Sequence, residues 1–151
     1  MSAEQERLVW QAFGMVNSGD VEGIVAMTAP DAEYELVGGF ADFEGEPVLR
    51  GPEGMRRFYT DWFATFTSTH VEPSAFIETG ERLLVIARLE VTAEGSDAPM
   101  QMNIGQIYSF KDGWINRVAS YYDVQAAVEA AGLTDRDVRN APGVMPPSAA
   151  P

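Results

Sequence analysis

The stretch from residue 98 to residue 123, APMQMNIGQIYSFKDGWINRVASYYD, constrains the fold of this chain more than any other segment. It predicts two long strands joined by a tight turn at residues 111–113, because Asp-Gly flanked by alternating apolar residues is a strong hairpin signal. Polar side chains are set among the apolar ones in both arms, whereas a strand with one face in water alternates more cleanly. We therefore expect one face of this hairpin to line a semi-polar cavity.

The composition predicts one globular domain and limits its chemistry. The chain has 151 residues, of which 46% are hydrophobic, so it can bury a sizeable core without disulfides or metals. The absence of cysteine excludes disulfides, thiolate metal sites and a catalytic cysteine, and it fits the cytoplasm. The net charge of −13 repels phosphate backbones, so we expect no nucleic-acid partner.

The sequence also lacks the signals of a membrane or secreted protein. The apolar runs are too short to span a bilayer, and the first ten residues have neither the basic nor the apolar region of a signal peptide. We therefore expect a cytoplasmic protein with no membrane partner.

The N-terminal part of the chain predicts helices around a single strand. Residues 4–16 and 21–27 place apolar side chains at helical spacing. Residues 32–37 alternate in polarity and predict a strand that has Tyr34 on one face. A long loop follows over residues 38–50.

A third helix is predicted to begin at Gly51, with Pro52 at its first position. Its aromatic stripe has two interpretations. One is plain core packing, and the other is that Tyr59 and Trp62 also form the wall of a ligand cavity. The positions of the stripe are Met55, Phe58, Tyr59, Trp62, Phe63 and Phe66.

The second half of the chain predicts strands. Residues 69–78 form a strand that Pro73 bends or confines to a sheet edge, and residues 83–93 form the next strand before the hairpin. A short helix over 124–131 closes the domain at residue 133, and residues 134–151 are interpreted as a C-terminal tail. Strands collected after helices indicate an α+β fold with a strongly curved antiparallel sheet.

Three segments carry a family resemblance: NSGDVEGIVAM at 17–27 followed by DAEY at 31–34, RGPEGMRRFY at 50–59, and FKDGWINR at 110–117. In this order and spacing they resemble the SnoaL-like (polyketide cyclase-like) branch of the nuclear transport factor 2-like superfamily. The resemblance implies a cone-shaped α+β barrel over residues 1–133, in which the sheet wraps around three N-terminal helices as a cystatin-like roll. It implies a pocket but no single activity, since the superfamily hosts isomerases, dehydratases, cyclases, epoxide hydrolases and non-enzymatic members.

The strand over 83–93 carries the charged candidate residues. Alternate residues of a strand share one face, which here carries Leu84, Ile86, Arg88 and Glu90. We expect this face to point into the pocket. Arg88-Leu89-Glu90 resembles the Arg-x-Asp of limonene-epoxide-hydrolase-like relatives, with Glu in place of Asp. Glu90 is then a candidate acid or base positioned by Arg88. The alternative is an ion pair at the sheet edge, outside any pocket.

The hairpin supplies neutral candidates. Ser120 stands where the resemblance places a catalytic Asp, and serine is no general base near neutral pH without a partner. The SnoaL-like match turns Gln106 inward, while a ketosteroid-isomerase-like match favours Asn103, and a bulge at Gly105 would reconcile the two. Either amide can bind a carbonyl or a hydroxyl.

Metal and cofactor chemistry is not expected. His70 is the only histidine, and it is either a surface residue or an acid/base near the pocket mouth. One histidine and no cysteine leave only scattered carboxylates as metal ligands.

Two functions fit the sequence. The first is a cofactor-independent isomerase, cyclase, dehydratase or hydrolase acting on an apolar, oxygenated substrate. The second is a non-catalytic ligand-binding or structural domain. In both cases apolar residues on both sheet faces predict a homodimer formed through the sheet. The expected substrate-binding residues are Tyr34, Tyr59, Trp62, Ile86, Asn103, Gln106, Ser120 and Tyr122.

Overall fold

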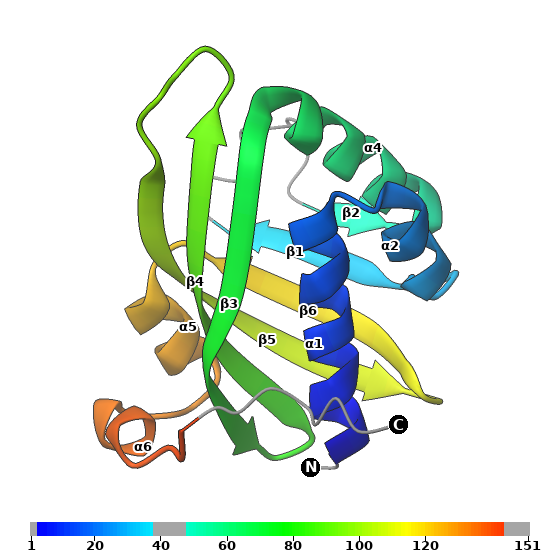
Figure 1. The fold of residues 1–151 in the computed structure, drawn as a ribbon. Helices are drawn as coiled ribbons and strands as arrows, with labels where there is room; N and C mark the ends of the chain where they lie inside the picture. The colour runs from blue at the N-terminus through cyan, green and yellow to red at the C-terminus, as the bar shows by residue number, and fades with distance from the viewer. Residues whose placement is uncertain (1–2, 38–47, 144–151) are drawn as a thin grey trace, which may run out of the picture.

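A computed structural model describes residues 3–37 and 48–143 of the chain (Figure 1). The helices are α1 (Ala3–Ser18), α2 (Val21–Met27), α4 (Gly51–Thr65), α5 (Val124–Ala130) and α6 (Asp135–Arg139). The strands are β1 (Glu33–Val37), β2 (Val48–Arg50), β3 (Phe66–Thr79), β4 (Arg82–Ala93), β5 (Met100–Lys111) and β6 (Trp114–Tyr121). The predicted loop over 38–50 therefore ends in a short strand, and its residues 38–47 lie outside the described residues.

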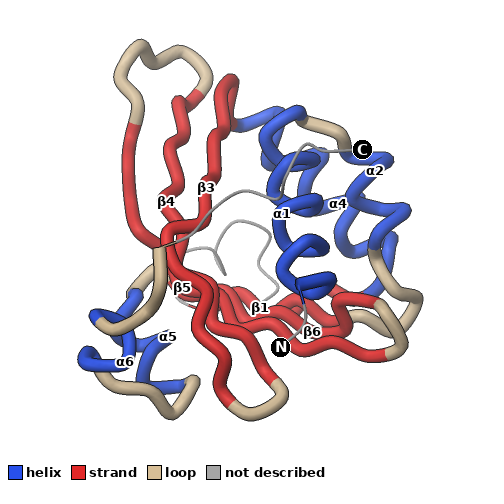
Figure 2. The backbone as a smooth tube through the Cα atoms, turned by 60° about the horizontal axis from the view of Figure 1, so that its bottom comes forward, coloured by secondary structure: helices blue, strands red, loops and turns tan. Residues whose placement is uncertain are grey.

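The six strands form one curved sheet in the order β2-β1-β6-β5-β4-β3. Figure 2 shows α1, α2 and α4 on one side of this sheet, and α5 and α6 on the other. The predicted α+β class, with a curved sheet around N-terminal helices, is confirmed. Two details differ: the sheet is not closed, and β1 pairs with β6 in parallel. The parallel pair is possible because a long connection, and not a hairpin turn, joins these two strands.

The central hairpin forms as predicted. Asp112 and Gly113 have φ angles of 54° and 82°, and this left-handed pair matches the right-handed twist of the flanking strands. The bulge at Gly105 that would reconcile the two family matches does not form, because the pairing with β4 and with β6 is regular at this residue. The register shifts instead between Ser109 and Phe110.

β3 is an edge strand, as Pro73 predicted, and its register shifts between Pro73 and Ala75. Its free edge is partly satisfied by α1, where Asn17 Nδ2 donates to the Val71 carbonyl at 3.0 Å and the Val71 amide donates to Asn17 Oδ1 at 2.7 Å. This reciprocal pair fixes the end of α1 against the sheet.

The two central strands β4 and β5 are buried on both faces. On β4, Val85 and Ala87 face the helices of the main core, while Leu84 and Ile86 pack in a second cluster under α5. Gly105 makes the approach of α5 possible, because a Cβ placed there would lie 2.4 Å from the Cβ of Ala127.

The residues after 133 are not simply a tail. Thr134 and Asp137 form a capping box at the start of α6, and Val138 and Ala141 pack against the cluster under α5. Thr79 Oγ1 also donates to the Ala131 carbonyl at 2.8 Å. The sequence pattern did not reveal α6, because this short helix contains too few apolar residues to show a helical period. Residues 144–151 lie outside the described residues.

The close contact at Gly105 predicts that Gly105→Ala destabilises the protein by about 1–3 kcal/mol through overpacking against α5. Chemical denaturation followed by circular dichroism measures the free energy of unfolding. The matched control is Gly14→Ala in α1, where a Cβ meets nothing within 4 Å. This control should gain up to about 1 kcal/mol from helix propensity. A Gly105→Ala variant as stable as the wild type would contradict the packing.

Candidate functional site

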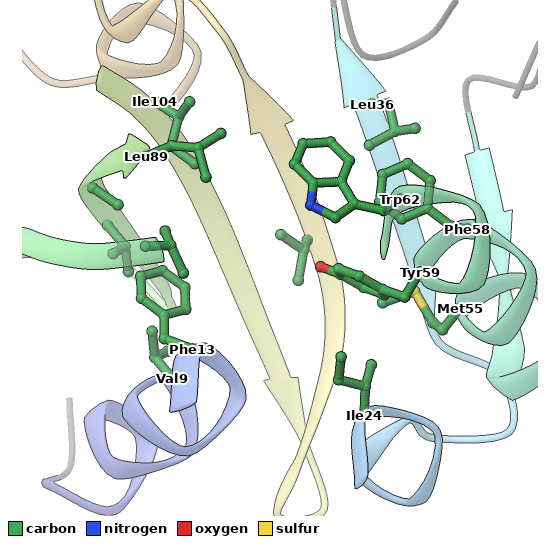
Figure 3. Close-up of a cluster of buried hydrophobic side chains, with 14 of the residues drawn as sticks. Val9, Phe13, Ile24, Leu36, Met55, Phe58, Tyr59, Trp62, Leu89 and Ile104 are labelled. Atoms are coloured by element: carbon green, nitrogen blue, oxygen red, sulfur yellow. The ribbon is translucent and has the colours of Figure 1, made fainter. Parts of the chain in front are cut away.

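A cavity of about 130 Å³ lies between α1, α2 and α4 and the concave face of the sheet. Its lining is mainly aliphatic and aromatic. Figure 3 shows these side chains converging from the helices and the sheet, with Tyr59 and Trp62 reaching from α4 into the space between them. Trp62 also donates its Nε1–H to Thr69 Oγ1 at 3.0 Å, and this hydrogen bond fixes the orientation of the indole.

One buried polar cluster interrupts the apolar lining. Gln106 Nε2 donates to the Tyr34 hydroxyl at 2.7 Å and to Ser120 Oγ at 3.3 Å. The Tyr108 hydroxyl donates to Gln106 Oε1 at 2.6 Å. Gln106 and Ser120 are only 5% and 2% exposed, so these partners replace the water that both side chains lose on folding.

The sheet register brings the cluster together. Gln106 and Ser120 are direct cross-strand partners on β5 and β6, and Tyr34 lies one strand further on β1. Tyr59 adds a hydrogen bond to Tyr34 from the opposite side, out of helix α4. The cluster therefore joins three strands to one helix at a single point of the cavity wall.

The tyrosines of the cluster remain protonated at neutral pH. Burial raises the pKa of Tyr34, against the opposing effect of its hydrogen bonds with Ser120, Tyr59 and Gln106. Burial, and then the neighbouring tyrosines, raise the pKa values of Tyr59 and Tyr108 well above the ordinary value. Each phenol is thus a hydrogen-bond donor rather than a base.

The charged residues that line the cavity are Glu33 and Arg117, and they pair with each other at 4.0 Å. Their side chains are 35% and 53% exposed, so they belong to the margin of the cavity that faces solvent. Arg117 also pairs with Glu35 at 3.1 Å, and Arg50 pairs with Glu33. The two arginines and two glutamates of this network balance each other in charge. Among the described residues, no charged side chain lines the interior of the cavity.

The prediction that Arg88 and Glu90 point into the pocket is wrong. Neither residue lines the cavity, and both side chains instead hydrogen-bond to Gln101 on the outer face of the sheet. The alternation of apolar and polar residues could not show which face of β4 points into the pocket, because residues 83–87 are apolar on both faces. Leu89, in the inward set on β4, lines the cavity instead.

Two further predicted residues share the outer face. Ile86 packs in the cluster under α5, and Asn103 is exposed opposite Arg88. Tyr122 is half-buried against the main core but does not line the cavity, and its burial raises its pKa. His70 is a surface residue, 3.7 Å from Glu72, as one of the two interpretations held.

The structure does bring five of the predicted residues together at the cavity: Tyr34, Tyr59, Trp62, Gln106 and Ser120. It adds Tyr108, which the sequence reasoning did not select. The signal was present, because Tyr108 lies two residues after Gln106 and so shares its face.

No helix within residues 3–37 and 48–143 is long and apolar enough to cross a membrane. Over the same ranges, no group of three or more acidic or histidine side chains is arranged to hold a metal ion.

The curved sheet that folds over N-terminal helices is an α+β fold that this chain shares with solved structures described as NTF2-like. More narrowly, the chain belongs to the SnoaL-like domain family, whose model matches residues 9–118. No curated protein matches the sequence.

Solved structures support the same fold. TerC, co-crystallised with polyporic acid, is 21% identical with a TM-score of 0.71, covering 86% of this chain and 99% of that one. A protein of ketosteroid isomerase-like fold from Catenulispora acidiphila, in complex with trimethylamine, is 15% identical with a TM-score of 0.67, covering 84% and 93%. The epoxide hydrolase/cyclase-like enzyme SalBIII is 23% identical with a TM-score of 0.62, covering 83% and 96%. At these identities the likeness shows the fold alone.

The raised pKa values predict an alkaline loss of stability. Unfolded tyrosines ionise near pH 10, while the buried phenols stay protonated to higher pH. Their contribution is therefore complete below pH 10 and is lost as the pH rises further, by up to about 1.4 kcal/mol per pH unit for each phenol. Urea unfolding between pH 8 and pH 11.5 measures this slope. Tyr59→Phe should flatten it above pH 10, and an unchanged slope in that variant would contradict the assignment.

Proposed function

We propose that this protein binds a small, largely apolar, oxygenated molecule in the cavity. The observation that carries the proposal is a buried polar cluster in a largely apolar lining, an arrangement typical of small-molecule sites. A cavity of about 130 Å³ is close to the size that holds one aromatic ring. The ring would lie among the apolar side chains, with its oxygen held at Tyr34, Gln106 and Ser120.

Charge supports a neutral ligand. The described interior offers only uncharged donors and acceptors, and its tyrosines resist ionisation. A carboxylate buried there would lose its hydration without gaining a cation, because Arg117 is already paired at the margin. The proposal therefore disfavours ionised acids.

A second candidate is cofactor-independent catalysis on such a ligand, as an isomerase, cyclase, dehydratase or hydrolase. It is favoured by buried hydroxyl donors, since such donors stabilise negative charge that develops on a substrate oxygen. The likeness to SalBIII, described as an epoxide hydrolase/cyclase-like enzyme, points the same way. Glu90 on the outer face supplies no base, so this candidate depends on hydrogen bonding and not on proton abstraction by Glu90.

Binding can be tested with acetophenone, a neutral single-ring probe, by titration under tryptophan fluorescence, because Trp62 lines the cavity. Ile104→Trp fills the cavity and should weaken binding at least about tenfold, by removing the space for the ring. Glu90→Gln, the outer-face control, should leave the affinity unchanged. Native mass spectrometry of freshly purified protein provides a second readout, through any co-purified molecule. Equal affinity in Ile104→Trp and wild type would overturn the proposal.

We further propose that two copies associate through the outer face of β3, β4 and β5. The support is a largely exposed polar array across the three strands, in which the positive Arg88 lies between the negative Glu72 and Glu90. Such an array can complement itself about a twofold axis. The apolar part of the outer face no longer supports a dimer, because α5 and α6 of the same chain cover it. The array comprises His70, Glu72, Arg88, Glu90, Gln101 and Asn103.

The dimer is tested by light scattering at micromolar concentration, where the wild type should have twice the mass of one chain. Arg88→Glu removes the central positive charge of the array and should shift the population towards monomer. Arg136→Glu in α6, outside the array, is the matched charge control and should remain a dimer. A monomeric wild type at this concentration would overturn the proposal.

A further inference from the structure

The polar side chains that line the cavity differ in whether they already have a partner. Those of the buried cluster bond to one another, the lining indole and both lining threonines are hydrogen-bonded, and Glu33 pairs with Arg117. Among the polar lining side chains within residues 3–37 and 48–143, that of Asn116 alone has no hydrogen bond or ion pair.

Asn116 lies at a β-bulge. Arg117 pairs with Ser109 and Ile115 pairs with Phe110, so Asn116 is an extra residue of β6 without a partner on β5. A regular strand turns every second residue away from a cavity, yet Ile115, Asn116 and Arg117 all line this one. Bulges re-aim side chains in this way and are over-represented next to active sites. The bulge thus brings three consecutive residues to the cavity, and the unpartnered carboxamide is among them.

One strand connects this carboxamide to the buried cluster. Asn116, Val118 and Ser120 occupy every second position of β6, and all three line the cavity. Asn116 is half-buried whereas Ser120 is 2% exposed, so the first lies towards the mouth and the second at the deep end. Four residues span about 13 Å along a strand. Less one hydrogen bond at each end, about 7–8 Å remains for the ligand, close to the separation of oxygen atoms on para substituents of one ring.

We propose that Asn116 makes the cavity specific for ligands with two polar ends, by hydrogen-bonding a second oxygen function at the mouth. The inference rests on the proposed binding function and names its ligand class: neutral single-ring compounds with an oxygen function at each end of the ring. A carboxamide offers both a donor and an acceptor, so it can satisfy a hydroxyl in both directions. Arg117 is less available, because Glu33 and Glu35 already pair with it.

The contact discriminates between ligands of the same shape. A ligand with an apolar group at this end removes water from the carboxamide of Asn116 and offers no hydrogen bond in return, which leaves a polar group unsatisfied. A ligand with a hydroxyl there replaces the water that it displaces. Asn116 therefore acts on the choice of ligand and leaves the packing of the ring to the apolar lining.

Two probes of one shape test this role: 4-(hydroxymethyl)acetophenone and 4-ethylacetophenone, titrated into the full chain and followed by amide NMR. Asn116→Leu removes the carboxamide at similar side-chain size, and it should lower the alcohol-to-ethyl affinity ratio at least about fivefold through the lost hydrogen bond. The ethyl probe should keep its affinity, which reports that the cavity is intact. Asn140→Leu, at the exposed end of α6, is the matched control and should keep the wild-type ratio.

A spectroscopic signature separates a hydrogen bond from a general change in polarity at the mouth. The side-chain NH2 signals of Asn116 are assigned by their absence from the spectrum of Asn116→Leu. In the wild type these signals should shift further with the alcohol than with the ethyl probe, because only the alcohol bonds to the carboxamide.

The outcomes are distinct. An unchanged affinity ratio in Asn116→Leu, or equal shifts of the Asn116 signals with both probes, would overturn the role of Asn116 while leaving the binding function intact. Failure of both probes to bind the wild type would overturn the binding function and the role of Asn116 together.

Discussion

Burial of the central strands on both faces is the constraint on which the rest of this structure depends. β4 and β5 are covered by the N-terminal helices on one side and by α5 on the other, so apolar residues fill both alternating sets of β4. Charged residues are then excluded from the middle of these strands. They appear only where the cover ends, as Arg88 and Glu90 do on the outer face. The cavity inherits its lack of charge from this double cover.

The same constraint explains the polar cluster. An uncharged side chain can be buried in such a core when its hydrogen bonds are satisfied, whereas an unsatisfied polar group costs about 1–3 kcal/mol. Gln106 meets this condition because Tyr108, Ser120 and Tyr34 are placed around it by the registers of β5, β6 and β1. The amide therefore holds three strands in a fixed arrangement while it faces the cavity.

Local patterns in the sequence predicted much of this arrangement. The Asp112-Gly113 turn and the edge position of the strand with Pro73 follow from rules that act over a few residues, whereas the inward direction of Gln106 and the site position of Ser120 came from the family resemblance. The face of β4 did not follow, because the run from Leu83 to Ala87 is apolar in both sets until α5 is placed against it. Helix α6 was missed although its capping residues are visible in the sequence, since its packing depends on contacts far along the chain.

The absence of charge in the interior of the described cavity, away from Glu33 and Arg117 at its margin, also decides what kind of chemistry the site can support. Phenols whose pKa values are raised by burial do not abstract protons near neutral pH, so the available action is hydrogen-bond donation to an oxygen. Such donation strengthens in a medium of low dielectric, and it strengthens further when the oxygen gains negative charge. Binding and catalysis then differ in one respect, which is whether the ligand's oxygen becomes more negative along a reaction path. A pocket that binds a ligand's oxygen through buried donors would for this reason also be equipped to stabilise an oxyanion, and the two candidate functions share one set of residues.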